Sequence, residues 1–151
     1  MSQSLVRIYV HLVFSTKHRQ PFLKDASLRK ECHAYLAGAC KQRGSPSIIV
    51  GGVEDHVHIL CFLSKIESVS VLIRELKRES SQWLKTKGPE LAAFYWQNGY
   101  GAFSVSPAHA EPLRGYIANQ EEHHLHYSFQ EEFRHLLTKC SLEWDERYVW
   151  D

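Results

Sequence analysis

The order in which strand and helix patterns follow one another over residues 6–106 constrains this fold more than any other feature of the sequence. Apolar side chains recur at every second position over residues 6–14, which predicts a half-buried strand. Asp25 can cap the helix that follows, and its apolar residues recur at helical spacing until Gly44 and Pro46 end it. The chain therefore begins with a strand and an amphipathic helix that lies on a core.

Two further strands and a second helix continue this order. Residues 48–50 and 57–63 are short apolar strands, and Gly51-Gly52 begins the turn of a hairpin between them. The next helix, over residues 68–87, has an apolar stripe on one face and basic residues on the other. We expect the apolar stripe to pack on the sheet.

The last part of the pattern completes a known topology. Asn98-Gly99 predicts a tight turn between residues 95–97 and a strand over residues 100–106. The order strand, helix, strand, strand, helix, strand is the split βαβ arrangement of ferredoxin-like α+β domains, with both helices on one face of an antiparallel sheet. We expect the other face of the sheet to be left open for a site.

Length and composition favour a single domain, because 151 residues with 44% hydrophobic content suffice for one core and not for two ordinary ones. We expect this domain, residues 1–151, to have three parts: a ferredoxin-like core at 1–106, a connector and helix at 107–127, and a tail at 128–151. Apolar residues in the tail indicate one more short helix: Phe129, Phe133, Leu136 and Leu137.

Charge is distributed unevenly along the chain although the net charge is only +1. Residues 1–110 hold 14 Lys and Arg against 8 Asp and Glu, a balance of +6, whereas residues 111–151 hold 4 against 9, a balance of −5. A basic body with an acidic end is compatible with phosphate binding on one surface, and equally with two ordinarily solvated surfaces.

Cysteine spacing and hydropathy bear on the compartment. The four cysteines lie far apart without a Cys-x-x-Cys pair, so we expect free thiols and neither a zinc knuckle nor a disulfide framework. No run approaches the roughly 18 to 20 apolar residues of a membrane span, and the N-terminal residues lack the pattern of a signal peptide. We expect a cytoplasmic protein without a membrane partner.

The third predicted strand carries two histidines, His56 and His58. Because side chains alternate in a strand, these two point the same way, roughly 7 Å apart along the chain, while Val57 and Ile59 face the helices. Two imidazoles on one strand can form half of a metal site. Ten histidines in the chain also make a chance pair unsurprising, so the pair alone leaves a structural role open.

A polar helix expected from about Pro112 to His126 carries the second group of candidates. Tyr116 and Gln120 lie four residues apart and hence on one face. The helix has few apolar anchors, so we expect it to be mobile or to be held by something other than the core. Residues 106–111 look like a connector that can carry it away from its own sheet. Gly115 would let a nucleic-acid backbone approach Tyr116, which could equally be an ordinary surface aromatic.

Two further stretches accompany these features, the sequence WQNGYGAFSVS at residues 96–106 and the ending Tyr148-Val149-Trp150. Together with the His-hydrophobe-His strand and the Tyr-x-x-x-Gln helix, they resemble the small single-tyrosine transposases of the HUH superfamily, which bacterial and archaeal insertion sequences encode. The likeness covers nearly the whole chain, and the motifs are specific as a set in this order and spacing.

The resemblance implies a DNA transposase that cleaves and rejoins single-stranded DNA at insertion-sequence ends through a 5'-phosphotyrosine intermediate. It implies that His56, His58 and Gln120 are metal ligands and that Tyr116 is the nucleophile. It also implies substrates that carry hairpins near the element ends, and a homodimer in which the tyrosine helix of one subunit completes the active site of the other in trans.

The sequence leaves two points of this chemistry open. Imidazole favours the later transition metals, so phosphate oxygens and water would supply the hard ligands for Mg²⁺ or Mn²⁺, which we expect in function. Mn²⁺, Zn²⁺ or Ni²⁺ could occupy an isolated site. Tyrosine has an ordinary pKa of about 10, so some group must help remove its proton, and metal proximity or His123 are the candidates.

Five basic residues are candidates for phosphate contacts: Lys17, Arg19, Arg74, Lys77 and Arg78. Two other functions compete with the transposase. One is a transposase-derived protein that binds DNA or RNA hairpins without cutting, against which the complete set of four site residues argues. The other is an unrelated metal hydrolase that uses the histidine pair, and the sequence shows no acidic cluster near that pair to support it.

Overall fold

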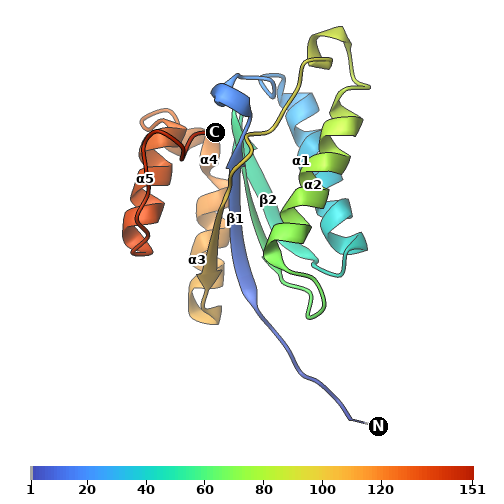
Figure 1. The fold of residues 1–151 in the computed structure, drawn as a ribbon, viewed down its shortest axis with the longest axis vertical. Coiled ribbons are helices and arrows are strands. Elements are labelled where there is room, and N and C mark those ends of the chain that lie inside the picture. The colour runs from blue at the N-terminus through green and yellow to red at the C-terminus, as the bar shows by residue number, and fades with distance from the viewer. Residues whose placement is uncertain (1) are drawn as a thin grey trace.

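The computed structural model describes residues 2–151, in which a four-stranded sheet lies between two layers of helices (Figure 1). The strands are β1 (Tyr9–Ser15), β2 (Ser47–Val53), β3 (His56–Phe62) and β4 (Gly101–Val105). They are ordered β2-β3-β1-β4, and every neighbouring pair is antiparallel. With helices α1 (Ala26–Gln42) and α2 (Val69–Leu84) in their places along the chain, the predicted ferredoxin-like fold is confirmed.

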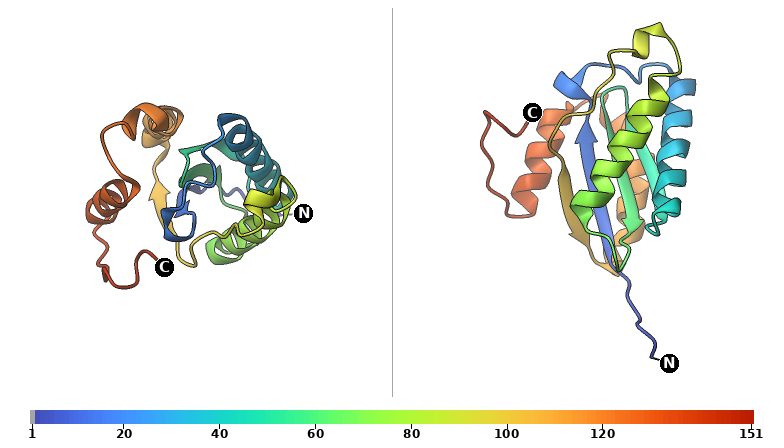
Figure 2. Two further views of the ribbon diagram at one scale, coloured as in Figure 1. Left: turned by 90° about the horizontal axis from the view of Figure 1, so that it is seen from above. Right: turned by 45° about the vertical axis from the view of Figure 1, so that its right-hand side comes forward.

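One face of the sheet packs on α1 and α2 and forms the main core (Figure 2). Val10, Leu12 and Phe14 of β1 point to this face and are almost completely shielded from solvent. Asp25 caps α1 with its side chain, as the sequence predicts, and the side chain of Ser68 caps α2 at the predicted start of that helix. The apolar periodicity of the two helices therefore places them on this side of the sheet.

The opposite face of the sheet is covered by three C-terminal helices, α3 (Pro107–Ala118), α4 (Gln120–His123) and α5 (Phe129–Lys139) (Figure 2). A second apolar cluster joins α5 to this face and consists of Val13, Phe103, Phe129, Phe133 and Leu137. The prediction of an open face was wrong because the tail helix has an apolar stripe of its own, and this stripe is buried against the sheet.

The segment expected to be a connector, residues 106–111, forms the first turns of α3 instead. Pro107 lies in the first turn, where a backbone N–H would have no partner within the helix, so the missing N–H of proline costs no hydrogen bond. Pro112 lies inside the helix. The helix ends before Asn119, and α4 follows after this break. The prediction of one helix from about Pro112 to His126 after a flexible segment is therefore wrong, because helix begins earlier and is interrupted.

Two predicted turns also lie elsewhere. β2 continues through Gly51-Gly52, and the hairpin turns at residues 54–55. Asn98-Gly99 closes no hairpin, since β4 pairs with β1 rather than with residues 95–97. The ammonium group of Lys77 instead binds the carbonyl oxygens of this segment, so a tertiary contact takes the place of a local turn.

The other sequence expectations about the chain concern cysteines and membrane spans. Cys32, Cys40 and Cys61 are free thiols inside the core, and Cys140 is a free thiol on the surface. Among residues 2–151, no helix has both the length and the apolar character needed to cross a membrane.

Candidate active site

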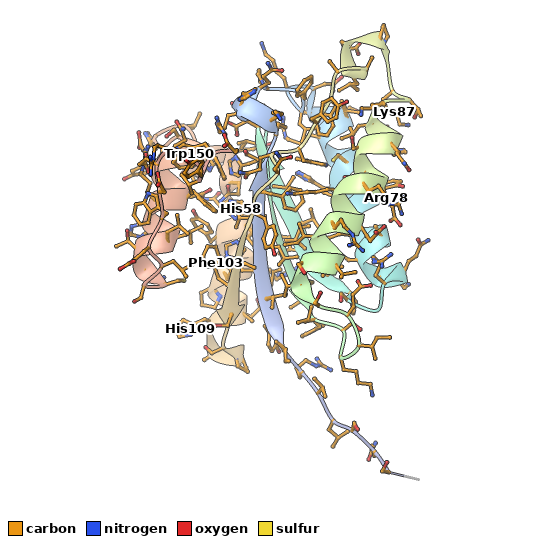
Figure 3. All side chains as sticks on the ribbon, in the orientation of Figure 1. His58, Arg78, Lys87, Phe103, His109 and Trp150 are labelled. Carbon is orange, nitrogen blue, oxygen red and sulfur yellow. The ribbon has the colours of Figure 1, made fainter. Side chains whose placement is uncertain are left out.

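Strand β3 directs alternate side chains into the two layers of the molecule. Val57 and Ile59 belong to the main core, whereas His56 and His58 point to the opposite face, and both imidazoles are completely buried. Figure 3 shows His58 between α2 on one side and the C-terminal segment on the other. The two predicted metal ligands thus share one face of a rigid strand.

Tyr116 and Gln120 come from the helical layer that covers this face. Tyr116 lies in the last turn of α3, and Gln120 is the first residue of α4. The side chain of Gln120 is buried, and His56 Nε2 donates a hydrogen bond of 3.1 Å to its Oε1 atom. All four predicted site residues are therefore brought together within one chain.

Gly51 explains how α3 comes so close to the sheet. A Cβ atom at this position would lie 2.6 Å from the carbonyl oxygen of Ile117 and 2.8 Å from its Cγ2 atom. Only glycine leaves room for this backbone contact, and the buried Ile117 follows Tyr116 directly in the chain. The glycine that the sequence predicts in a turn thus sets the position of the tyrosine helix.

Glu132 of α5 occupies the centre of the site, which the sequence reasoning did not find. Its Oε1 atom accepts a hydrogen bond of 2.8 Å from His58 Nε2 and lies 3.3 Å from His56 Nε2. Its Oε2 atom accepts hydrogen bonds from the Tyr116 hydroxyl and, at 3.1 Å, from Gln120 Nε2. One carboxylate thus contacts all four predicted site residues.

The pattern of α5 contains a signal that could have indicated Glu132. Phe129 and Phe133 define the apolar face of this helix, and Glu132 lies three residues after the first and one before the second. This spacing puts the carboxylate within the apolar stripe, where only 5% of the residue is exposed. Charged residues are almost never buried without partners, so a charge on the core face of a helix indicates a site.

Two further side chains, those of Asp55 and His11, orient the histidine pair. His56 Nδ1 donates to Asp55 Oδ1 at 2.7 Å, and His11 Nε2 shares a hydrogen bond of 2.8 Å with His58 Nδ1. These contacts leave the Nε2 atom of each strand histidine directed at the centre of the site. Metal-binding histidines are commonly oriented in this way by a partner on the other ring nitrogen.

The electrostatics of the site couple a carboxylate to an imidazolium. Burial by itself would raise the pKa of Glu132, but the imidazoles of His124, His56 and His58 outweigh it and hold that pKa well below its usual range. Burial would likewise lower the pKa of His56, but Asp55 and Glu132 raise it to about 9. A cation that enters this site therefore displaces the proton of an imidazolium.

The residues present fit a divalent cation. The potential ligand atoms of His56, His58, His124 and Glu132 all lie within 4.8 Å of one another. Nε2 of His124 is buried and makes no hydrogen bond, and it lies 3.2 Å from Glu132 Oε2. Imidazole nitrogens and carboxylate oxygens are common protein ligands of divalent metals.

A cleft of about 930 Å³ leads from the surface to the tyrosine. It runs between β4, α3 and α5, and its walls include Phe103, Tyr116, His123, Tyr127 and Leu136. His123 Nε2 lies 3.2 Å from the Tyr116 hydroxyl, which makes it a partner of the tyrosine rather than of the histidine pair. The cleft is the route by which a ligand can reach the site.

The basic residues proposed for phosphate contacts lie away from this cleft. Arg74 and Arg78 are exposed on α2, on the other side of the sheet, and Figure 3 shows Arg78 there. Lys77 uses its ammonium group for the loop carbonyls described above. Lys17 and Arg19 belong to a short 3-10 helix after β1, and the guanidinium of Arg19 donates to the carbonyl oxygen of Trp150 at 2.6 Å.

Comparisons with solved structures place this fold among transposases. It is similar to a transposase candidate from Deinococcus radiodurans R1, with a TM-score of 0.61 and 22% identity over 80% of this chain and 98% of that one. It is also similar to a REP-associated tyrosine transposase bound to a REP hairpin, with a TM-score of 0.59 and 13% identity over 82% of this chain and 74% of that one. At these identities, the likeness concerns the fold.

Comparison of the sequence with protein families identifies the group more closely. Residues 4–120 match the family described as IS200-like transposases. The chain therefore belongs to the IS200-like transposase family. A comparison with proteins of curated function found no match.

Proposed function

We propose that this transposase cleaves and rejoins single-stranded DNA at the ends of an insertion sequence, with Tyr116 as the nucleophile. The observation that carries the proposal is the convergence of Tyr116, Gln120, His56 and His58 on one buried centre, described above. Two imidazoles, an amide and a tyrosine from three separate elements have no shared role in packing. They do have a shared role in phosphodiester chemistry.

In the proposed reaction, His56, His58 and Gln120 hold a divalent ion, Mg²⁺ or Mn²⁺. When bound, the ion supplies a positive charge that polarises the scissile phosphodiester. The Tyr116 oxygen forms a bond to phosphorus, the bond to the 3' oxygen breaks, and the products are a 5'-phosphotyrosine and a free 3'-hydroxyl. A 3'-hydroxyl of another strand can later attack this linkage, which releases the tyrosine and restores a phosphodiester without ATP.

The proton of Tyr116 needs an acceptor, since burial and then Glu132 raise the pKa of this hydroxyl above its ordinary value. Two groups are within reach of the hydroxyl: Glu132 Oε2 and His123 Nε2. The pKa of Glu132 is held well below its usual range, so His123 is the proposed acceptor as the phosphorus bond forms, and the 3' oxygen takes up a proton as it leaves.

Single-stranded DNA fits the cleft better than a duplex. Apolar and aromatic side chains line the approach to Tyr116, and such side chains bind unpaired bases by stacking. Opening a perfect duplex costs about 1.4 kcal/mol per base-pair step, so a paired substrate reaches the tyrosine less readily. Lys17, Arg19, Arg74, Lys77 and Arg78 remain proposed phosphate contacts, and because they lie away from the cleft they would bind parts of the DNA outside it.

The geometry of the single chain is compatible with two subunit arrangements. In the single chain, Tyr116 lies beside the histidines of its own sheet, so the site can be assembled without a partner. A homodimer that exchanges the tyrosine helices would assemble the same site in trans. Mixing Tyr116→Phe with His58→Ala distinguishes the two: activity returns on subunit exchange if the site is shared, and stays absent if each site belongs to one chain.

The covalent intermediate provides the direct test of the proposal. Single strands copied from the hairpin-forming sequences that flank the gene, incubated with the protein and Mn²⁺, should give a DNA adduct that survives denaturation. Tyr116→Phe should abolish the adduct and keep DNA binding, whereas the matched control Tyr100→Phe should form it. Hairpin binding by the wild type without any adduct would favour the non-cutting alternative and refute the proposal.

A further inference from the structure

We propose that Glu132 is a fourth protein ligand of the divalent ion, so that helix α5 completes a metal site which β3 and α4 enclose only in part. This inference rests on the metal site of the proposed function. It adds a ligand from a helix that lies outside residues 4–120, the part of the chain that matches the family.

The spacing of the donor atoms supports this role. Glu132 Oε1 lies 2.8 Å from His58 Nε2 and 3.3 Å from His56 Nε2, and Gln120 Oε1 lies 3.1 Å from His56 Nε2. Neighbouring ligands of an octahedral ion with bonds of about 2.1 Å are separated by about 3.0 Å. The carboxylate oxygen therefore already lies at a distance from each imidazole that two ligands of the same ion would have.

Burial supports the same role. The carboxylate lies beneath the surface between Phe129 and Phe133, which hold α5 on the sheet through the second apolar cluster. Taking a carboxylate out of water costs several kcal/mol unless strong partners replace the lost hydration. In this site the partners are imidazoles whose Nε2 atoms point to one centre, and a divalent cation would satisfy the carboxylate and the imidazoles together.

The charge of Glu132 also matches the metal that the reaction needs. His56, His58 and Gln120 are neutral ligands, and two of them are imidazoles, a set suited to Zn²⁺ or Ni²⁺. An anionic oxygen ligand adds the hard, negatively charged donor that Mg²⁺ and Mn²⁺ prefer. Glu132 therefore sets the preference of the site among divalent metals.

The C-terminal residues hold this ligand in place. Val149 and Trp150 pack against the second apolar cluster, beside Phe129 and Phe133. The backbone N–H of Gly99 donates to the carbonyl oxygen of Asp151 at 2.8 Å. The last residues of the chain thus fasten α5 to the sheet and fix the position of the carboxylate.

Metal affinity measured without DNA tests the inference. Mn²⁺ is titrated calorimetrically into the wild type, Glu132→Gln and the matched control Glu131→Gln, whose residue lies one position earlier on the exposed side of α5. Removing a group that merely orients a metal ligand already lowers metal affinity by about 10- to 100-fold. Removing a ligand should cost no less, so the Mn²⁺ affinity of Glu132→Gln should fall by at least about tenfold. The affinity of Glu132→Gln for Zn²⁺ should fall by less than its affinity for Mn²⁺. Glu131→Gln should bind both metals as tightly as the wild type. Mn²⁺ affinity in Glu132→Gln within twofold of the wild type would overturn the inference.

A second measurement does not depend on how well the variant folds. A crystal of the wild-type protein grown with Mn²⁺ should show an anomalous peak in bonding contact with Glu132. In the titrations described above, Glu132→Asp, which keeps the carboxylate, should retain part of the Mn²⁺ affinity. A peak bonded to His56 and His58 with Glu132 turned away would refute the ligand role while the proposed function stands. Failure of the wild type to bind Mn²⁺ or to form the DNA adduct would instead refute the proposed function.

Discussion

The contact between Gly51 and α3 gives the sharpest test of how the fold positions the nucleophile. In Gly51→Ala, the new methyl group would lie 2.6 Å from the carbonyl oxygen of Ile117, whereas ordinary contact begins at 3.4 Å. The backbone of α3 must therefore retreat by about 0.8 Å, or the strand must yield by the same amount. Overpacking of this kind in a close-packed interior typically costs about 1–3 kcal/mol.

The displacement should affect the reaction more than the binding of DNA. Ile117 is the neighbour of Tyr116, so a retreat of α3 carries the tyrosine oxygen away from the histidines of β3. A misplacement of about 1 Å can cost about 100-fold in rate, and we expect adduct formation to slow by about 10- to 100-fold. DNA affinity should change little, because the cleft lies on the other side of α3 from Gly51.

The assay combines urea unfolding with single-turnover adduct formation. Gly38→Ala is the matched control, since a Cβ atom at this position in α1 meets nothing within 4 Å. This control should gain about 0.4–1 kcal/mol of stability and keep the adduct rate. Gly51→Ala with unfolding free energy and adduct rate equal to those of the wild type would refute the role assigned to this contact.

Three further predictions concern other parts of the molecule. Lys77→Met should lower the free energy of unfolding by about 1.5–3 kcal/mol, because the ammonium group binds three loop carbonyls. In the same urea titrations, Arg74→Met, at an exposed position of α2, should have an unfolding free energy within about 0.5 kcal/mol of the wild type. Burial, followed by the charge of nearby Arg29, lowers the pKa of His33 to about 4 in the folded protein. In the unfolded chain this imidazole binds its proton near pH 6.5, so between pH 6.5 and 4 the unfolded state binds a proton that the folded state does not. Wild-type stability should therefore fall as the pH drops from 6.5 to 4, and His33→Gln should flatten this dependence in unfolding measured at both ends; an unchanged slope would contradict it. A thiol reagent should modify only Cys140 in the native protein, and rapid modification of a second thiol would contradict the burial of the other three.

Much of the fold could be predicted because it is recorded in local periodicity. The alternation that puts His56 and His58 on one face of β3, and the apolar stripes of α1 and α2, follow from the pitch of a strand and of a helix. Each helix also begins at a side chain that can accept the first backbone N–H groups, Asp25 in one and Ser68 in the other. These features need no knowledge of distant residues, and the structure confirms them.

Turns and helix ends at the site were harder to predict, because distant groups compete with the local signals. A Gly-Gly pair such as Gly51-Gly52 is typical of a turn, yet here the close approach of Ile117 requires a glycine within a strand. Pro107 is typical of a connector, yet it also fits the first turn of a helix, where a proline loses no hydrogen bond. In both cases the residue type allows two local structures, and packing against another element selects one.

The sequence by itself determined the order of strands and helices and the identity of four residues that a resemblance brings to one site. Only the tertiary structure decided that the second face of the sheet is covered and that the carboxylate of Glu132 enters the site. Glu132 is separated by 74 residues from His58, and nothing in the spacing of either motif records their contact. The physical reason is that periodicity specifies which face of an element is buried, whereas the partner of that face is chosen by the packing of the whole chain.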